Sequence, residues 1–432
     1  MKPIHVLHIT AHLGGGVGKV LSRLVEESHK KRDGILHTIV ALEALEKSQF
    51  ADHLTANGGK LIICPSQEEL NLLVSSADIV QLEWWHHPVV AAWLCGAHLP
   101  AMRLVVWSHV SGLFPPQILP GFVQAPHRFL FTSPCSYEHP ALKTLSSDVM
   151  HRTDAVFSSG GFTDLPMAPQ RPDKMPLRYG YVGTLNFAKL HPQLMAFLAA
   201  VDLPDFRLDM VGDPTTAHEL IGQAEATGIA DRIALRGYCS NIADTLAGFD
   251  VFVYLLNPLH YGTTENALLE AMAMGVVPIV INNPAERQLI RHGETGLLVD
   301  SPVEFSSALR FLAENPDKRR QMANRAAEET RLRFSIETTH TNLNAHYANV
   351  LQEQKKEFDF KGIFGNHPAD WFRSCQDKDN WRFPDMLPDV AACSARGPHY
   401  LYEKNKSSVF HYQRTFPNDH RLAAWAKQLE NQ

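Results

Sequence analysis

Residues 260–281 read HYGTTENALLEAMAMGVVPIVI and join an apolar helix pattern directly to an apolar strand pattern. The helix is predicted over residues 265–274 and the strand over Val277–Ile281. Thr263 and Thr264 offer hydroxyl caps, and Glu265 is expected in the first turn, where negative charge is favoured. A helix that feeds a short buried strand is the repeating unit of a parallel sheet covered by helices.

Glu270 is the only polar side chain between Ala267 and Met274. A carboxylate buried in such an apolar helix needs polar partners, because uncompensated charge in an interior is costly. The vicinal hydroxyls of a ribose would satisfy the carboxylate with two hydrogen bonds. The alternative is that Glu270 faces water, and the residues alone leave both interpretations open.

The same alternation of strands and helices runs through the first 160 residues. A helix is predicted over Val17–Lys30, and strands are predicted between and around such segments. The strand patterns in this part of the chain are Ile4–Thr10, Leu36–Leu42, Lys60–Cys64, Ile79–Leu82, Leu104–Trp107 and Phe129–Ser133.

A proline-rich stretch, TDLPMAPQRPDKMP, interrupts the alternation at residues 163–176. Proline at this density opposes both helices and sheet ladders, which favours a linker. The pattern then restarts with strands expected at Tyr179–Gly183, Arg207–Gly212, Ile233–Arg236, Val251–Leu255, Val277–Ile281 and Gly296–Val299.

The chain is therefore expected to hold two doubly wound α/β domains of the Rossmann-like class. We expect an N-terminal domain at 1–162, a linker at 163–176, a second domain at 177–335, and a long return helix at 336–358. The extension 359–432 carries twelve aromatic residues. Disordered tails are poor in aromatic residues, so this extension is expected to pack onto a domain.

A glycine run stands between the first predicted strand and helix, in TAHLGGGVGKVLSRL at residues 10–24. Gly14, Gly15 and Gly16 allow the backbone to approach an anion and to direct N–H groups at it, next to a helix amino end. The alternative is a plain tight turn. The run is not G-x-G-x-x-G, which argues against an NAD-dependent oxidoreductase.

Polar and aromatic residues follow two further strands. His109, in VVWSHVSG, lies just past a strand, at the edge where ligands bind in open α/β sheets. It could donate a hydrogen bond to a phosphate or sugar oxygen, or be satisfied by local backbone. The segment EWWHHP at residues 83–88 could face a sugar, although core packing is the alternative for its tryptophans.

Composition excludes several function classes. The net charge of −6 provides no basic footprint for nucleic acid. No apolar stretch reaches the roughly 18 residues of a spanning helix, and no leader pattern stands at the amino terminus. A cytoplasmic protein is expected, and peripheral attachment at the inner face of a membrane stays open. The six cysteines include no C-x-x-C pair that would point to a metal, and no metal and no cofactor is expected.

Residues 268–300, LLEAMAMGVVPIVINNPAERQLIRHGETGLLVD, resemble the donor-site signature of family 4 retaining glycosyltransferases of the GT-B fold. GGGVGKVLSRL, WSHVSG and YVGTLNFAKLHP resemble further landmarks of that family, in the same order. The resemblance covers about residues 1–350. It implies two Rossmann-like domains facing across a cleft, with the nucleotide held by the second domain.

The resemblance also implies an activity. A sugar would move, with retention of its anomeric configuration, from a UDP-type or GDP-type donor to a hydroxyl of a glycan, lipid-linked or small-molecule acceptor. The alternatives on the same fold are a catalytically silent glycan-binding or scaffold protein, or a nucleotide-sugar epimerase.

By position the resemblance implies His109 near the donor sugar, Lys189 at the leaving diphosphate, Glu270 on the nucleotide ribose, and Gly15 with Gly16 near phosphate and acceptor. Glu265 is added to His109 and Lys189 as an expected catalytic residue. The expected donor-binding residues are Gly15, Gly16, Glu270 and, in addition, Thr184, Thr263, Thr264 and Asn266.

Two positions depart from the family pattern. Gly262 stands where the family has the first of two glutamates eight residues apart, and Glu265 is the candidate to replace it. Thr184 stands where the family has an arginine, so Arg178 or another side chain would have to supply that cation.

Overall fold

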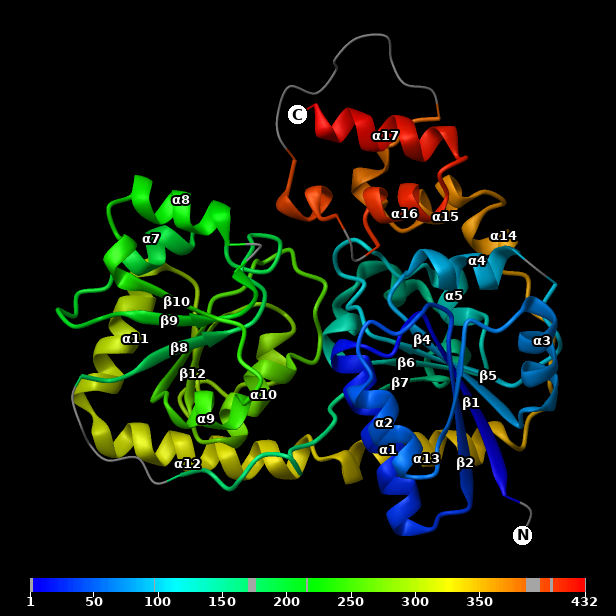
Figure 1. The fold of residues 1–432 in the computed structure, drawn as a ribbon, viewed down its shortest axis with the longest axis horizontal. Helices are drawn as coiled ribbons and strands as arrows, with labels where there is room; N and C mark the ends of the chain where they lie inside the picture. The colour runs from blue at the N-terminus through cyan, green and yellow to red at the C-terminus, as the bar shows by residue number, and fades with distance from the viewer. Residues whose placement is uncertain are drawn as a thin grey trace. The chain divides into compact units, whose positions relative to one another are not determined.

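The computed structural model describes residues 3–96, 98–169, 176–214, 217–385, 397–404 and 407–431. The chain divides into two compact units (Figure 1). The first unit comprises Met1–Gly160, the short segment Tyr261–Thr264 and Ile336–Gln432, and the second comprises Gly161–His260 and Glu265–Ser335. Each unit is built around its own parallel sheet.

The first sheet has seven strands in the order β3-β2-β1-β4-β5-β6-β7, all parallel. Its central strands are buried because helices cover both faces, and they carry polar side chains, such as His8 of β1 and Glu83 of β4, among the apolar ones. The order reverses between β1 and β4, so the loops that leave these two strands turn to opposite sides. The strands are β1 Ile4–Thr10, β2 Ile35–Ala41, β3 Lys60–Ile63, β4 Ile79–Trp84, β5 Leu104–Ser108, β6 Arg128–Phe131 and β7 Thr153–Ala155.

Helices of the first unit alternate with these strands. In α1, Val20, Leu21, Leu24 and Val25 are buried at helical spacing, and the helix packs against α2 and α13. The helices are α1 Gly15–Lys31, α2 Gln49–Ala56, α3 Gln67–Ser76, α4 Pro88–Gly96, α5 Pro120–Gln124, α6 Ser147–Met150, α13 Ile336–Val350, α14 Lys361–Phe364, α15 Pro368–Ser374, α16 Val409–Thr415 and α17 His420–Glu430.

The second sheet has six parallel strands in the order β10-β9-β8-β11-β12-β13, and its order reverses between β8 and β11. The helix and strand that the quoted stretch predicts are α10 and β12. The strands are β8 Tyr179–Val182, β9 Leu208–Val211, β10 Ile233–Gly237, β11 Val251–Tyr254, β12 Val277–Ile281 and β13 Leu297–Val299. The helices are α7 Leu194–Ala199, α8 His218–Ala226, α9 Ile242–Ala247, α10 Asn266–Ala273, α11 Pro302–Glu314 and α12 Pro316–Arg333.

The predicted return helix is shorter than the sequence pattern indicates. Helix α13 ends at Val350 instead of continuing toward residue 358. The helix is followed by a turn at residues 351–352, and Lys356 then exchanges two backbone hydrogen bonds with Met102, at 3.0 and 3.1 Å. A helical backbone could not make this pair, so the tertiary contact overrides the polar helix pattern.

The aromatic extension packs onto the first unit, as its composition predicts. Phe360 and Phe364 share a core cluster with Trp84, Phe122 and Phe129 of the first sheet and its helices. Helices α14, α15 and α16 contact α4 (Figure 1). The extension thereby completes a core that the strands and helices before residue 160 leave open on one side.

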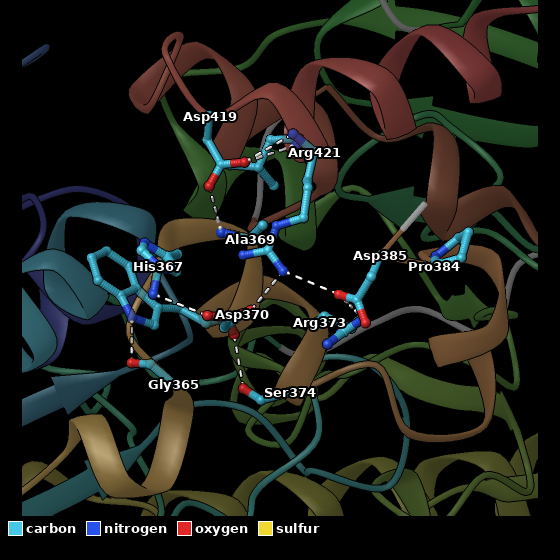
Figure 2. A network of polar contacts seen from close by, with 12 residues as sticks. Gly365, His367, Ala369, Asp370, Arg373, Ser374, Pro384, Asp385, Asp419 and Arg421 are labelled. Atoms are coloured by element: carbon cyan, nitrogen blue, oxygen red, sulfur yellow. Dashed lines mark hydrogen bonds and ion pairs between the residues drawn. The ribbon is translucent and has the colours of Figure 1, made fainter. Parts of the chain in front are cut away.

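Ion pairs hold the helices of the extension to one another (Figure 2). Arg421 donates to Asp370 at 2.8 Å and to Asp385 at 3.2 Å, and Arg373 donates to Asp385 at 2.7 Å. Asp419 caps α17 and also accepts the Ala369 N–H at 3.1 Å. The extension is therefore a layer of helices on the first unit, joined to one another by ion pairs and hydrogen bonds.

Part of the predicted linker lies outside the described residues, namely 170–175. The described remainder of 163–176 forms neither helix nor strand. Two elements were not predicted from the sequence. One is β7, because Thr153–Ala155 has no apolar pattern, and the other is α12. In the part of the chain that the structure describes, no helix combines the length and the apolar character needed to span a membrane.

Phe364→Ala should lower the free energy of unfolding by about 3–5 kcal/mol, the usual cost of removing a buried phenylalanine. The ring is 2% exposed and lies 5.0 Å from the ring of Phe122 and 5.5 Å from that of Trp84. Urea unfolding measures the change. Phe311→Ala is the control, because Phe311 is 40% exposed and its loss should cost little. Equal effects of the two substitutions would contradict this account of the extension.

Candidate functional site

The two order reversals indicate where ligands would bind. In open α/β sheets the crevice lies beyond the carboxyl ends of the strands, at the point where the strand order turns. In the first unit this point is between β1 and β4, and in the second between β8 and β11. The candidate residues of each unit gather at its own reversal and are described unit by unit.

The glycine run lies at the amino end of α1. Gly14 is the N-cap, and Gly15 has a φ of +58°, a left-handed conformation that favours glycine. Gly15 and Gly16 are exposed. No acidic residue occupies the first turn of this 17-residue helix. An exposed helix amino end suits an anion, and anion binding by Gly15 and Gly16 stays a prediction.

His109 follows β5 and is held by a carboxylate. Its Nε2 lies 2.7 Å from Oε2 of Glu83 on β4, and its backbone N–H donates to the Trp84 carbonyl at 2.7 Å. The ring also packs 5.0 Å from that of Trp107. Since an ionised carboxylate only accepts, Nε2 of His109 carries the proton and the ring orientation is fixed.

Glu83 is a residue to which the sequence analysis assigned no role. It is fully buried, and burial by itself would raise its pKa. Hydrogen bonds from His109 and His8 outweigh burial and lower the pKa of Glu83. Gln81 adds a third hydrogen bond at 2.7 Å. The carboxylate therefore stays ionised beside His109.

A chain of buried polar contacts continues from Glu83 across the sheet. His8 Nδ1 lies 3.3 Å from Glu83, and His8 Nε2 lies 2.9 Å from Nδ1 of His37. His37 Nε2 lies 2.8 Å from the hydroxyl of Ser28, which lies 2.9 Å from Asp33. His109 is thus one end of a polar chain through the first unit.

This series of polar contacts ends on helix α13. His340, on α13, contacts the Asp33 carboxylate through Nε2 at 2.7 Å, and Asn344 donates to the same oxygen at 3.1 Å. Contacts between residues this far apart in the sequence give no local signal in the sequence.

In the second unit, Lys189 lies on the loop that leaves β8. The loop is tied to the segment after β11, because the Asn257 N–H donates to the Lys189 carbonyl at 2.8 Å. Lys189 Nζ donates to Glu265 Oε2 at 2.7 Å, and its side chain is 21% exposed. The structure therefore brings two of the predicted catalytic residues, Lys189 and Glu265, into direct contact.

Glu265 is buried among polar partners. Besides Lys189, the Tyr254 hydroxyl donates to Oε2 at 2.8 Å, and Nδ1 of His260 lies 3.7 Å from Oε1. Burial would raise the pKa of Glu265, but the nearby charges of Lys189 and His260 and these hydrogen bonds lower it to about 2. The carboxylate is held charged with the Lys189 ammonium beside it.

The predicted capping of α10 is wrong. The helix begins at Asn266 with Glu265 as its N-cap, and no side chain caps it. The Thr263 hydroxyl lies 2.6 Å from that of Thr132, and the Thr264 hydroxyl donates to the Thr132 carbonyl at 2.9 Å. Glu265 is turned to Lys189 and Tyr254 because an ion pair and a phenol stabilise it more than a helix end does.

The remaining donor-site candidates also lie at the second reversal. Glu270 is half-buried on α10, one turn after Asn266, so it is neither enclosed nor fully in water. The Thr184 carbonyl accepts the Tyr181 hydroxyl at 2.9 Å. Arg178 cannot replace the missing arginine, because it precedes β8 at the opposite edge of the sheet and pairs with Asp250 at 3.2 Å.

Comparisons with known proteins bear on the family and the fold. Residues 166–329 match the family of glycosyl transferases group 1. The putative glycosyltransferase EpsD of Bacillus subtilis (strain 168) is 26% identical over 221 residues, which are 48% of this chain and 57% of that protein. The lipopolysaccharide core biosynthesis mannosyltransferase LpsB of Rhizobium meliloti (strain 1021) is 30% identical over 159 residues, 34% of this chain and 44% of that protein.

The chain thus spans about half the length of the curated relatives that it matches. A solved structure, Anabaena HepE in complex with UDP, has a TM-score of 0.63 at 15% identity and covers 80% of this chain and 100% of that one. This likeness shows the fold, and the predicted GT-B class is confirmed.

Glu265→Gln should remove a pH-dependent part of the stability. A folded-state pKa near 2, below the usual value of 4.5, contributes stability that is present above about pH 4.5 and lost as the pH falls through about 2. The stability difference between wild type and variant should therefore shrink over this range in urea titrations at stepped pH. The control is Glu314→Gln, an exposed carboxylate on α11. A pH-independent difference would contradict the low pKa of Glu265.

Proposed function

We propose that this chain, which resembles family 4 retaining glycosyltransferases and whose residues 166–329 belong to the glycosyl transferases group 1 family, transfers a sugar from a nucleoside diphosphate to a hydroxyl. The observation that carries the proposal is the Lys189–Glu265–Tyr254 cluster at the order reversal of the second sheet. This cluster lies beside the amino end of α10, inside the matched segment.

The donor class follows from the charge of this cluster. A nucleoside diphosphate is an anion, and Lys189 is a half-buried cation whose partner in the structure is Glu265. We propose that, when the donor binds, the Lys189 ammonium pairs with the diphosphate in place of Glu265. The Glu265 carboxylate then contacts the donor sugar. In this way Glu265 would take the role of the family's first glutamate, in whose place this chain has Gly262.

Other residues receive supporting roles in this proposal. The ribose binds Glu270, with Thr184 and Asn266 near the phosphates. His109, oriented by Glu83, contacts the donor sugar, and the exposed N–H groups of Gly15 and Gly16 bind an anionic or hydroxyl group. Thr263 and Thr264 complete the donor site through the backbone next to Glu265.

The chemistry is a substitution at the anomeric carbon. The bond from that carbon to the diphosphate breaks, the acceptor oxygen forms its bond on the same face, and the acceptor proton passes to the departing diphosphate. Negative charge grows on the diphosphate as the bond breaks, so a fixed ammonium beside it lowers the barrier. Lys189 is the group placed to do this.

The relatives' names support the substrate choice. HepE was crystallised with UDP, and LpsB is named for lipopolysaccharide core biosynthesis. We therefore propose a UDP-sugar donor and a glycan or lipid-linked acceptor. A cytoplasmic location, at the inner face of a membrane when the acceptor is lipid-linked, fits that acceptor class.

Product analysis with a sugar-labelled UDP donor and a panel of glycan and lipid-linked acceptors tests the activity. Label that moves to an acceptor with unchanged anomeric configuration supports the proposal. Free labelled sugar, an epimerised nucleotide sugar, or binding of the donor without turnover would each contradict it. A panel of GDP-sugars run in parallel tests the nucleotide choice separately.

Lys189→Ala should lower kcat by about 10²–10³-fold with a smaller change in the donor KM, because the ammonium acts mainly on charge that develops at bond cleavage. Steady-state kinetics at saturating donor measure both constants. Lys318→Ala, an exposed lysine on α12, is the matched control and should change neither. Wild-type kcat in the Lys189 variant would remove Lys189 from the leaving group.

Glu270→Ala should weaken UDP binding by about 1–3 kcal/mol, the range for leaving hydrogen-bonding groups without a partner. Isothermal calorimetry with UDP, and with uridine, which keeps the ribose and lacks the diphosphate, separates the ribose contribution from that of the phosphates. The control is Glu314→Ala on α11, where the carboxylate is exposed. Unchanged UDP affinity would exclude Glu270 from the ribose contact.

A further inference from the structure

Three side chains from distant segments converge beside the carboxyl edge of the first sheet. Glu43 follows β2, His87 follows β4, and His411 lies on α16 of the extension. One donor atom from each of the three lies within 4.8 Å of the others. The transfer mechanism uses none of these residues, and all three belong to the first unit.

The imidazole of His87 makes no hydrogen bond to any residue that the structure describes. Its ring is 3% exposed, Nδ1 is buried without a partner, and Nε2 lies 3.6 Å from Glu43 Oε2. That separation is too long for a hydrogen bond. Buried imidazoles are otherwise paired, so a ring this enclosed requires another partner.

The surroundings supply the ligand types that a transition metal prefers. The rings of His87 and His411 lie 4.5 Å apart and nearly perpendicular, at 86°. His12, which follows β1, has its ring 5.8 Å from that of His87. Two imidazoles and a carboxylate suit zinc, whereas calcium and magnesium select oxygen ligands.

We propose that Glu43, His87 and His411 bind a Zn²⁺ ion. Zinc bonds to nitrogen and oxygen are about 2.0–2.2 Å, which places neighbouring donor atoms about 3.4 Å apart in a tetrahedral site. The three donor atoms lie within 4.8 Å of one another and therefore need to close by up to about 1.4 Å, which rotation of the half-exposed Glu43 and His411 side chains would provide. The long contact between the Ser407 N–H and His411 Nδ1, at 3.3 Å, is given up on binding.

The ion would fasten the extension to the first sheet. Its ligands come from the β2 and β4 loops on one side and from α16 on the other, so binding joins residue 411 to residues 43 and 87. We assign it this structural role and no step of sugar transfer. The proposal does not rest on the proposed function, since metal binding is measured without substrate.

The experiment titrates chelator-treated, full-length protein with Zn²⁺ in a calorimeter and repeats the titration with Co²⁺ while recording visible absorption. We expect one Zn²⁺ per chain and a raised melting temperature, because an ion that binds only the folded state stabilises it. His411→Ala and Glu43→Gln should each weaken the affinity at least about tenfold, since even outer-shell changes cost that much.

His420→Ala is the matched control, because His420 is an exposed histidine of the same extension and lies outside the cluster. Its affinity for Zn²⁺ should equal that of the wild type. His411 and Glu43 are half-exposed, so their variants should fold without the ion, and circular dichroism checks this. Absence of stoichiometric binding, or equal affinity in the wild type and both cluster variants, would overturn the proposal.

Discussion

The right-handed crossover between parallel strands is the constraint on which both units depend. It places every carboxyl strand end at one edge of a sheet, and where the strand order reverses, neighbouring loops leave in opposite directions. The reversal between β1 and β4 gathers the glycine run and Glu83, and that between β8 and β11 gathers Lys189 and Glu265. In each unit, topology therefore brings that unit's candidate residues together.

Much of the fold could be predicted from the sequence, because buried parallel strands are short apolar runs that need no partner to be recognised. β1 and β12 have the predicted bounds. The errors lie where a tertiary contact competes with a local pattern. Lys356 pairs with Met102 and ends the helical course of the chain early. β7 is identified by its pairing with β6, and its three residues carry no apolar signal.

The candidate site was predictable only in part. Each of Lys189 and Glu265 was predicted separately, from its motif. Their ion pair depends on the loop that carries Lys189, which a hydrogen bond from the Asn257 N–H holds beside the end of β11. The sequence placed Glu83 in an aromatic segment but did not predict its hydrogen bond with His109. Burial of a carboxylate within an apolar strand was the available signal, since such a group requires donors.

The polar chain from Glu83 to Asp33 limits how many of its hydrogen-bonding contacts can hold a proton. Both ends are carboxylates that accept hydrogen bonds, and His8, His37 and Ser28 lie between them in four successive contacts. In the state in which both rings are neutral, they and the hydroxyl bring three protons to the four contacts. Burial and the neighbouring His8 lower the pKa of His37, which opposes a fourth proton there. One contact in that state has no proton, and moving that defect from one end to the other inverts both histidine tautomers between His109 and the far side of the sheet.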